Sequence, residues 1–196
     1  MSDEQTLGVY DMQAADYAKR FATDRPDPRL DAFLAEMPAG AHVLELGCGP
    51  GRTAARMIAA GLTVDAVDAS AGMAAQAKAQ FGVTVRVASF DQIEGTKIYD
   101  GIWANFSLLH APRAKFPGHL AALHTAAKPG ARLHIGMKQG TGEGRDSLGR
   151  HYAYYRENEL TDLLSQAGFS VTKSDLGDAM GMAGAREPWI IQTAYA

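Results

Sequence analysis

The sequence predicts an α/β fold in which helices cover both faces of a doubly wound, mostly parallel sheet. Segments with helical and with strand-like hydrophobic spacing alternate along the chain, which is typical of this architecture. A short apolar strand at residues 42–46 runs into a turn with glycines at every second position. The last two strand-like segments leave no room for a helix of about ten residues between them, so they should pair as an antiparallel hairpin.

Local signals define the individual elements. Aromatic and small residues recur at helical spacing over 10–21, before a break at 24–28 that is rich in Asp and Pro. Gly61 and Gly168 are suited to end helices, and Ser70 is suited to cap a helix N-terminus. The predicted helices are 10–21, 29–37, 52–60, 70–80, 117–127 and 157–167, and the predicted strands are 42–46, 63–67, 83–87, 98–105, 131–137, 169–174 and 189–195.

The glycine turn and the strand that follows it point to a nucleoside ligand. Gly47, Gly49 and Gly51 lack a Cβ atom, so a ligand could lie directly on the main chain. Asp68 follows Gly47 by 21 residues, at the tip of the next strand, where a carboxylate can accept hydrogen bonds from both hydroxyls of a ribose. A tight strand-to-helix connection without a ligand is the structural alternative.

The spacing of the glycines separates two kinds of nucleoside. Dinucleotide-binding turns follow the pattern G-x-G-x-x-G, and Arg52 stands here at the third glycine. The observed Glu45-x-Gly47-x-Gly49-x-Gly51 resembles the first motif of class I S-adenosylmethionine-dependent methyltransferases. That resemblance implies that Glu45 helps to hold the ammonium group of S-adenosylmethionine and that Asp68 binds its ribose.

The resemblance extends from about residue 10 to the end of the chain. Residues 99–110, Tyr-Asp-Gly-Ile-Trp-Ala-Asn-Phe-Ser-Leu-Leu-His, look like the family's fourth-strand motif, and residues 127–131, Ala-Lys-Pro-Gly-Ala, match its fifth-strand motif with alanines at both ends. It implies a Rossmann-like, seven-stranded sheet with an antiparallel last strand and N-terminal helices that cap the cofactor site. Residues 138–160 further resemble small bacterial enzymes that include those labelled tellurite-resistance methyltransferases.

The resemblance also assigns the other cofactor contacts. Phe90 and Asp91 are expected to contact adenine, Met73 to cover its other face, and Asn105 and Phe106 to flank the sulfonium. Core packing of Phe90 and Met73, a turn cap at Asp91, and a first helix that only covers the fold remain open alternatives. The full expected cofactor set is Tyr17, Arg20, Glu45, Gly47, Cys48, Gly49, Gly51, Asp68, Ala69, Met73, Ser89, Phe90, Asp91, Asn105 and Phe106.

The methyl acceptor is less well defined by the sequence. His110 is the residue of the fourth-strand motif whose pKa suits general-base work, although a structural or substrate-orienting role is the alternative. Residues 138–155 are rich in glycine, cations and tyrosines and are expected to form a mobile substrate loop. Within it, Arg145, Arg150 and Tyr152 are the candidates for binding an anionic acceptor, unless the arginines pair with Glu143 and Asp146.

Composition restricts the partners. A net charge of -3 and a pI near 6.0 predict no binding to nucleic acid or to anionic membranes, and residues 105–108 lack the Asn/Asp-Pro-Pro-aromatic motif of enzymes that methylate nucleic-acid amines. The N-terminus carries no signal-peptide pattern, so a cytoplasmic protein is expected. Its oligomeric state, monomer or homodimer, stays open at this point. The single cysteine, Cys48, is expected to be a small buried residue, and no metal site is predicted.

We expect one methyltransferase domain over 1–196. Its parts are a helical cap at 1–37, a cofactor-binding core at 38–138, and a substrate loop with the C-terminal helix and hairpin at 139–196. A cofactor-binding protein without catalytic activity and an NAD(P)-dependent oxidoreductase remain the alternative functions.

Overall fold

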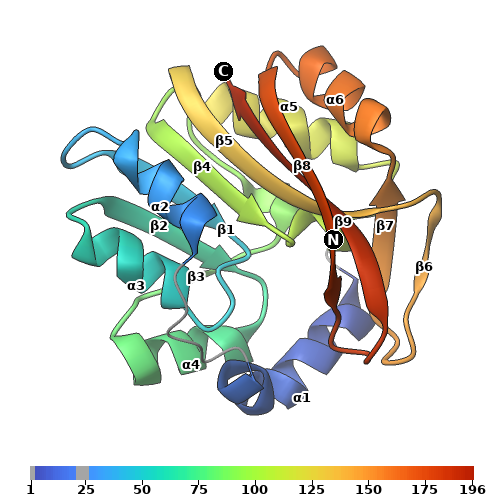
Figure 1. The fold of residues 1–196 in the computed structure, drawn as a ribbon. Helices are drawn as coiled ribbons and strands as arrows, with labels where there is room; N and C mark the ends of the chain where they lie inside the picture. The colour runs from blue at the N-terminus through green and yellow to red at the C-terminus, as the bar shows by residue number, and fades with distance from the viewer. Residues whose placement is uncertain (1–2, 21–26) are drawn as a thin grey trace.

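The computed structural model describes residues 3–20 and 27–196. A single β-sheet lies at its centre, with helices packed on both faces (Figure 1). Within these residues its strands are β1 (His42–Leu46), β2 (Thr63–Asp68), β3 (Arg86–Val87), β4 (Tyr99–Asn105), β5 (Ala127–Gln139), β6 (Glu143–Arg145), β7 (His151–Tyr155), β8 (Ser170–Met180) and β9 (Arg186–Tyr195). The helices are α1 (Glu4–Arg20), α2 (Pro28–Ala35), α3 (Arg52–Ala59), α4 (Ala71–Phe81), α5 (Phe116–Ala126) and α6 (Glu157–Gln166), with short 3-10 turns η1 (Phe90–Gln92) and η2 (Leu108–His110).

The strand order confirms the doubly wound prediction. Strands β3, β2, β1, β4 and β5 pair in that order and run parallel. Strand β9 then pairs antiparallel with β5, from Arg132 opposite Tyr195 to Lys138 opposite Trp189, and β8 pairs with β9. The antiparallel last strand is therefore confirmed, and the path from β3 to β8 contains the seven predicted strands.

The prediction of a loop over residues 138–155 is wrong for two segments, 143–145 and 151–155, which form strands β6 and β7. Strand β7 pairs parallel with the end of β5, with Tyr154 opposite Lys138, and β6 pairs antiparallel with β7. The interior of β7 explains this, because Tyr152, Ala153 and Tyr155 are buried in the main core. Their burial outweighs the glycine content that suggested a loop.

Several element boundaries also differ from the prediction. Helix α1 begins at Glu4 rather than at residue 10, because the Asp3 carboxylate accepts hydrogen bonds from the backbone N–H and the hydroxyl of Thr6 and so caps the helix. Strand β3 is limited to two residues, and β5 extends beyond the predicted range at both ends. Phe21, predicted to lie in the first helix, and residues 24–26 of the predicted break lie outside the described residues.

Alternation along the strands divides the core between the two faces of the sheet. Leu44 and Ile102 pack in the main cluster with the apolar side chains of α5 and α6, whereas Val43 and Trp103 pack with α2 and the Met57 side chain of α3. Adjacent residues of β1 and β4 thus bury opposite faces, as the period of two requires. Both faces are covered, which fixes the register of the central strands.

Helix α1 lies across the edge of the sheet at which the parallel strands end (Figure 1). The Asp11 carboxylate of α1 accepts hydrogen bonds from the Ser70 hydroxyl at 2.5 Å and from the Gly72 backbone N–H at 2.9 Å, at the start of α4. At its other end, the Arg20 guanidinium donates to the backbone oxygens of Gly181 and Met182. These contacts hold α1 between α4 and the turn that joins β8 to β9.

Among residues 3–20 and 27–196, none of the helices has both the length and the apolar character that a membrane-spanning helix needs.

Candidate functional site

A cavity of about 290 Å³ opens where β1, β2 and β4 end, bordered by α1. We call it the first cavity. It lies where β1 has β2 on one side and β4 on the other, the point at which doubly wound folds bind ligands. Its walls come from α1, the glycine turn and the strand ends, and they consist of Asp3, Thr6, Leu7, Tyr10, Tyr17, Gly47, Gly49, Asp68, Ala69, Met73, Phe90, Asn105, Phe106, Ser107 and His110.

The three glycines of the turn serve different purposes, although all have positive φ. A Cβ atom at Gly47 would lie 2.3 Å from the Cβ atom of Ser107, and one at Gly51 would lie 2.6 Å from that of Ala77. At Gly49 a Cβ atom would have nothing within 4 Å, and this glycine lines the first cavity. Gly47 and Gly51 are therefore required by packing, whereas Gly49 leaves the main chain open toward the cavity.

Asp68 lies at the end of β2 with its carboxylate held by the backbone. One oxygen accepts from the Gly49 N–H at 2.8 Å and the other from the Ser70 N–H at 2.9 Å. Burial raises the pKa of Asp68, and these two N–H groups oppose the rise. Because each carboxylate oxygen can accept a second hydrogen bond, both remain able to bind ligand hydroxyls in the cavity.

Two buried polar atoms near the glycine turn have no hydrogen-bond partner among the described residues, namely Glu45 Oε2 and Ser107 Oγ. Burial, and next the charge of Asp68, raise the pKa of Glu45 well above its usual value. Buried polar atoms are nearly always paired in folded proteins. Ser107 lines the first cavity, so its unpartnered hydroxyl indicates a ligand with polar groups, whereas Glu45 is not among the residues that line this cavity.

The end of β4 is held in an unusual conformation. Phe106 has φ of 56°, which is strained for a bulky residue, and its backbone N–H donates to Gly136. The adjacent Asn105 accepts a hydrogen bond at Oδ1 from Nε2 of His134 at 3.0 Å. Burial lowers the pKa of His134 to about 3, so the ring is neutral at pH 7 and can hold the Asn105 amide in one orientation.

The structure divides the other predicted cofactor residues into two sets. Tyr17, Ala69, Met73 and Phe90 line the first cavity. Four others do not. Cys48 packs in the core cluster between α3 and α4, where burial raises the pKa of its thiol, Ser89 bonds to Gln92, Asp91 pairs with Lys115, and Arg20 reaches the turn between β8 and β9.

A second cavity, of about 240 Å³, shares a wall with the first. Tyr10, Tyr17, Phe106 and His110 line both. The rest of its lining comes from η2, the end of β5, the β6–β7 region and the β8–β9 hairpin, and consists of Leu109, Lys138, Arg150, Tyr152, Ala179, Met180, Gly181, Met182, Glu187, Pro188 and Trp189.

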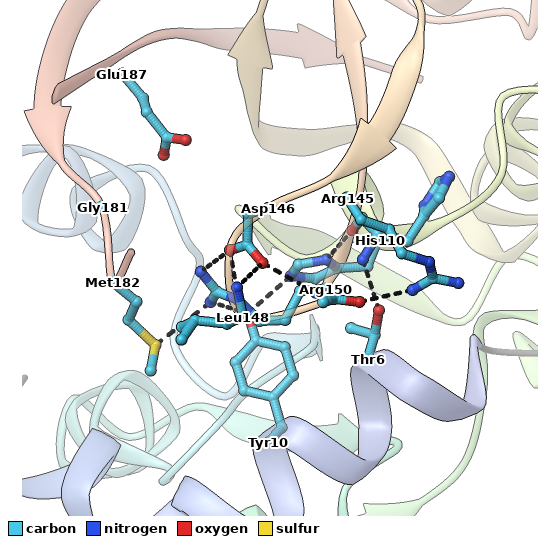
Figure 2. Close-up of polar contacts among 12 residues, drawn as sticks. Thr6, Tyr10, His110, Arg145, Asp146, Leu148, Arg150, Gly181, Met182 and Glu187 are labelled. Carbon is cyan, nitrogen blue, oxygen red and sulfur yellow. Dashed lines mark hydrogen bonds and ion pairs between the residues drawn. The ribbon is translucent and has the colours of Figure 1, made fainter. Parts of the chain in front are cut away.

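His110 is fixed within a chain of hydrogen bonds (Figure 2). Its Nδ1 lies 2.6 Å from the His151 carbonyl oxygen and therefore carries the hydrogen, so that Nε2 accepts from the Tyr10 hydroxyl at 2.8 Å. The Tyr10 oxygen accepts in turn from Arg150 at 3.0 Å, and Arg150 pairs with Asp146 at 2.6 Å. Burial lowers the pKa of His110 to about 3, which makes it a weak base in this arrangement.

Both arginines that were expected to bind an anionic acceptor form ion pairs with carboxylates of the protein itself. Arg150 lies in the second cavity wall but is buried against Asp146, the alternative that the sequence left open. Arg145 lies outside both cavities and forms two hydrogen bonds with Asp3 across the start of α1, at 2.6 and 2.8 Å. Tyr152 is buried in the wall of the second cavity.

No curated protein matches this sequence significantly. Residues 43–130 match the family model described as a methyltransferase domain. This region is similar to methyltransferase domains.

Solved structures extend the similarity beyond the methyltransferase domain. The Burkholderia thailandensis 1,6-didemethyltoxoflavin-N1-methyltransferase, solved with its substrate and S-adenosylhomocysteine, is 25% identical, with a TM-score of 0.75 over 96% of this chain and 87% of that one. Magnesium protoporphyrin IX methyltransferase from Synechocystis PCC 6803 is 18% identical, with a TM-score of 0.73 over 98% and 99%. A [4+2]-cyclase is 17% identical, with a TM-score of 0.73 over 99% and 96%.

The methyltransferase domain fits S-adenosylmethionine, the cofactor of this family. The first cavity presents the open main chain at Gly49 and the two acceptor oxygens of Asp68, which suit a ribose. Glu45 precedes the turn by two residues and has an unpartnered carboxyl oxygen, and such an oxygen suits an ammonium group. Phe90 and Met73 add apolar surface to the lining of the same cavity.

Sequence reasoning missed several residues of the two cavities. Tyr10 was read only as part of an amphipathic helix, and Ser107 only as part of the segment after β4. Met182, Glu187 and Trp189 belong to a hairpin whose contact with α1 is not local in the sequence. The position of Ser107 within the fourth-strand motif, directly after Asn105 and Phe106, is an available signal, whereas the hairpin residues offer none.

Proposed function

We propose that this protein transfers the methyl group of S-adenosylmethionine to a small molecule bound in the second cavity. The observation that carries the proposal is the shared wall of Tyr10, Tyr17, Phe106 and His110 between two cavities of different character. A transfer reaction needs donor and acceptor sites that meet at one point. The first cavity fits the cofactor, and the second is then the place for the acceptor.

In this proposal, the residues of the first cavity hold and orient the cofactor. Asp68 accepts the ribose hydroxyls, and Asn105 and Phe106 lie at the reacting end. Glu45, on the strand just before the turn, offers its unpartnered oxygen as an acceptor for the ammonium group. The bound cofactor supplies an electrophilic methyl group on a positively charged sulfur. The strained main chain at Phe106 places its ring in the wall that both cavities share.

The aromatic wall orients the acceptor and excludes water. Tyr10 and Tyr17 meet edge to face, with ring centroids 5.9 Å apart, and Tyr10 meets the His110 ring at 5.3 Å. Alignment of the nucleophile with the methyl group accounts for much of the rate of such displacements. Because both nitrogens of His110 are occupied and its pKa is lowered, we assign it an orienting role through Tyr10 in place of the predicted general base.

The remaining expectations follow from the composition. We propose a single domain that acts in the cytoplasm on free small molecules, since a net charge of -3 gives no attraction to nucleic-acid phosphates. Gel filtration would show whether it is a monomer or a homodimer. Binding to a fluorescent DNA duplex at low salt would contradict the small-molecule assignment.

A cofactor-binding protein without methyl transfer is the second candidate. The similarity to a [4+2]-cyclase supports this second candidate. That protein has the same fold but is named for a reaction other than methyl transfer. An oxidoreductase is less well supported, because Arg52 interrupts the dinucleotide pattern.

Two measurements separate these functions. Calorimetric titration with S-adenosylhomocysteine and with NAD should give binding of the first only, and the reverse result would exclude the methyltransferase. A screen with tritiated S-adenosylmethionine over phenols, thiols, heterocyclic amines, carboxylates and metalloid oxyanions should then transfer label to at least one class. Tight binding of the cofactor product without any labelled acceptor would favour the non-catalytic candidate.

A further inference from the structure

The charges around the second cavity are compensated within the protein. Lys138 and Arg150 are the cations among its lining residues. Lys138 Nζ lies 2.5 Å from Glu187 Oε2, and Arg150 forms two hydrogen bonds with the Asp146 carboxylate at 2.6 and 3.0 Å. Arg150 and Asp146 are both almost completely buried as side chains, so a ligand carboxylate would have to displace an internal partner to reach either cation.

Aromatic and thioether groups make up most of the remaining wall. The ring of Tyr152 lies 4.6 Å from that of His110, and Lys138 Nζ lies 3.4 Å from the centre of the Tyr152 ring. On the hairpin, a Cβ atom at Gly177 would lie only 2.2 Å from the Trp189 ring, so the absence of a side chain there lets the indole lie against the backbone. Such rings favour flat ligands, which they contact over a large apolar area.

The size of the second cavity limits the ligand further. Its volume of about 240 Å³ is smaller than the volume of about 290 Å³ of the first cavity, so the acceptor should be smaller than the cofactor. The turn after β8 closes one side, where Met182 approaches Arg150 with its sulfur 3.4 Å from a guanidinium nitrogen. One or two fused rings therefore fit better than a long flexible chain.

We propose, on the basis of the proposed function, that the acceptor is a small, planar, uncharged aromatic or heteroaromatic molecule whose polar edge binds the Lys138–Glu187 pair. Lys138 has hydrogens beyond the one directed at Glu187, and Glu187 has further acceptor positions. A neutral ring with adjacent donor and acceptor groups, such as a lactam, satisfies both members of the pair without separating them. This replaces the anionic acceptor expected from the arginines alone.

Because Lys138 and Glu187 neutralise each other, the affinities of neutral and anionic probes can be compared as a test. We use two pairs of probes, and the two members of each pair differ only in a carboxylate. The pairs are 4-quinolone with 4-quinolone-3-carboxylate, and lumazine with lumazine-6-carboxylate. Binding to the protein saturated with S-adenosylhomocysteine is measured by calorimetry, and methyl transfer by tritium incorporation. The wild-type protein should bind the neutral member of each pair at least tenfold more tightly. Preferential binding of the carboxylates, or no binding of either probe at millimolar concentration, would overturn the proposal.

Glu187→Gln should reverse part of this preference. The substitution leaves the Lys138 charge without its carboxylate, so the carboxylated probes should gain at least tenfold relative to the neutral ones. Asp178→Asn is the matched control, because it removes a carboxylate of the same hairpin that pairs with Arg186 and does not line the cavity. An unchanged ratio in Glu187→Gln would show that the pair does not contact the acceptor. Neutral probes that bind without accepting tritium would contradict the proposed methyl transfer and leave the cavity assignment intact.

Discussion

Nε2 of His110 lies 2.8 Å from the hydroxyl oxygen of Tyr10, which joins helix α1 to the segment that follows β4. The same hydroxyl accepts a hydrogen bond from Arg150, whose partner Asp146 lies in the turn between β6 and β7. Three parts of the chain that are distant in sequence thus meet at one phenol. Because Tyr10 and His110 line both cavities, this hydrogen bond holds two side chains of the wall that the cavities share.

Tyr10→Phe should lower both stability and catalysis. It removes the donor to His110 Nε2, which leaves this buried nitrogen unpaired, and one of the acceptors of Arg150, which keeps Asp146. The loss should cost about 1–3 kcal/mol of unfolding free energy. Urea unfolding measures the first effect, and kcat for methyl transfer should fall with little change in affinity for S-adenosylhomocysteine. Tyr195→Phe, which removes an exposed bond to Glu36, is the control. Equal effects of the two substitutions would show that the buried network has no special importance.

The buried histidines should make stability depend on pH. Burial lowers the pKa of His110 and of His134 to about 3, from an ordinary value of 6.5. Between these values the unfolded chain binds protons that the folded protein does not, so the stabilisation is complete above pH 6.5 and decreases as the pH falls toward 3. Unfolding free energies from pH 7.5 to 4 should show this decrease.

His110→Asn provides the internal comparison for that pH dependence. Removal of the packed imidazole ring lowers stability at every pH, whereas the loss of titration flattens the slope below pH 6.5. A variant with the wild-type slope would mean that His110 titrates normally in the folded protein.

Glu45→Gln should stabilise the protein while weakening cofactor binding. Burial and the charge of Asp68 raise the Glu45 pKa, so the folded protein retains a proton that the unfolded chain loses above pH 4.5, and stability decreases as the pH rises from there. The neutral amide avoids this cost, so the unfolding free energy of the variant should decrease less between pH 5 and pH 8 than that of the wild-type protein. Affinity for S-adenosylhomocysteine should fall at least tenfold. Asp162→Asn on the exposed face of α6 should change neither quantity.

Asp68→Asn should weaken S-adenosylhomocysteine binding by about 1–3 kcal/mol, because it removes a charged acceptor for the ribose hydroxyls. Calorimetric titration gives the value directly. Asp65→Asn is the matched control on the same strand, since Asp65 pairs with Arg86 and Tyr99 and does not line the first cavity. If both variants bound equally well, the ribose would have to lie elsewhere.

Gly47→Ala should mainly lower stability, whereas Gly49→Ala should mainly lower the affinity for the cofactor. Alanine at 47 combines positive φ with a 2.3 Å approach to Ser107 and should cost about 2–4 kcal/mol of stability. Alanine at 49 meets open space, so it should cost only about 1–2 kcal/mol and act mainly by lowering cofactor affinity. Thermal unfolding with and without S-adenosylhomocysteine distinguishes them. Partial recovery of stability in Gly47→Ala combined with Ser107→Gly would confirm the steric part.

Local patterns predicted the elements that depend on neighbouring residues. The apolar segments of β1 and β4, the glycines that follow α3 and α6, and the Ser70 cap of α4 identified strands and helices of the core. The start of α1 was missed because the Asp3 cap lies among polar residues without hydrophobic spacing. Strand β7 was missed because its tyrosines were interpreted as ligand-binding groups, although Tyr155 is needed to fill the main core.

The sequence by itself determined the fold class and the cofactor motif, because periodicity, glycine spacing and the acids at two strand ends are local properties of the chain. Tertiary structure alone decided which charged groups are available around the proposed acceptor site. It paired Arg145 with Asp3 and Arg150 with Asp146, and it placed Glu187 against Lys138. Whether a charged side chain is available to a ligand depends on which carboxylate lies within hydrogen-bonding distance, and folding brings these partners together from positions up to 142 residues apart.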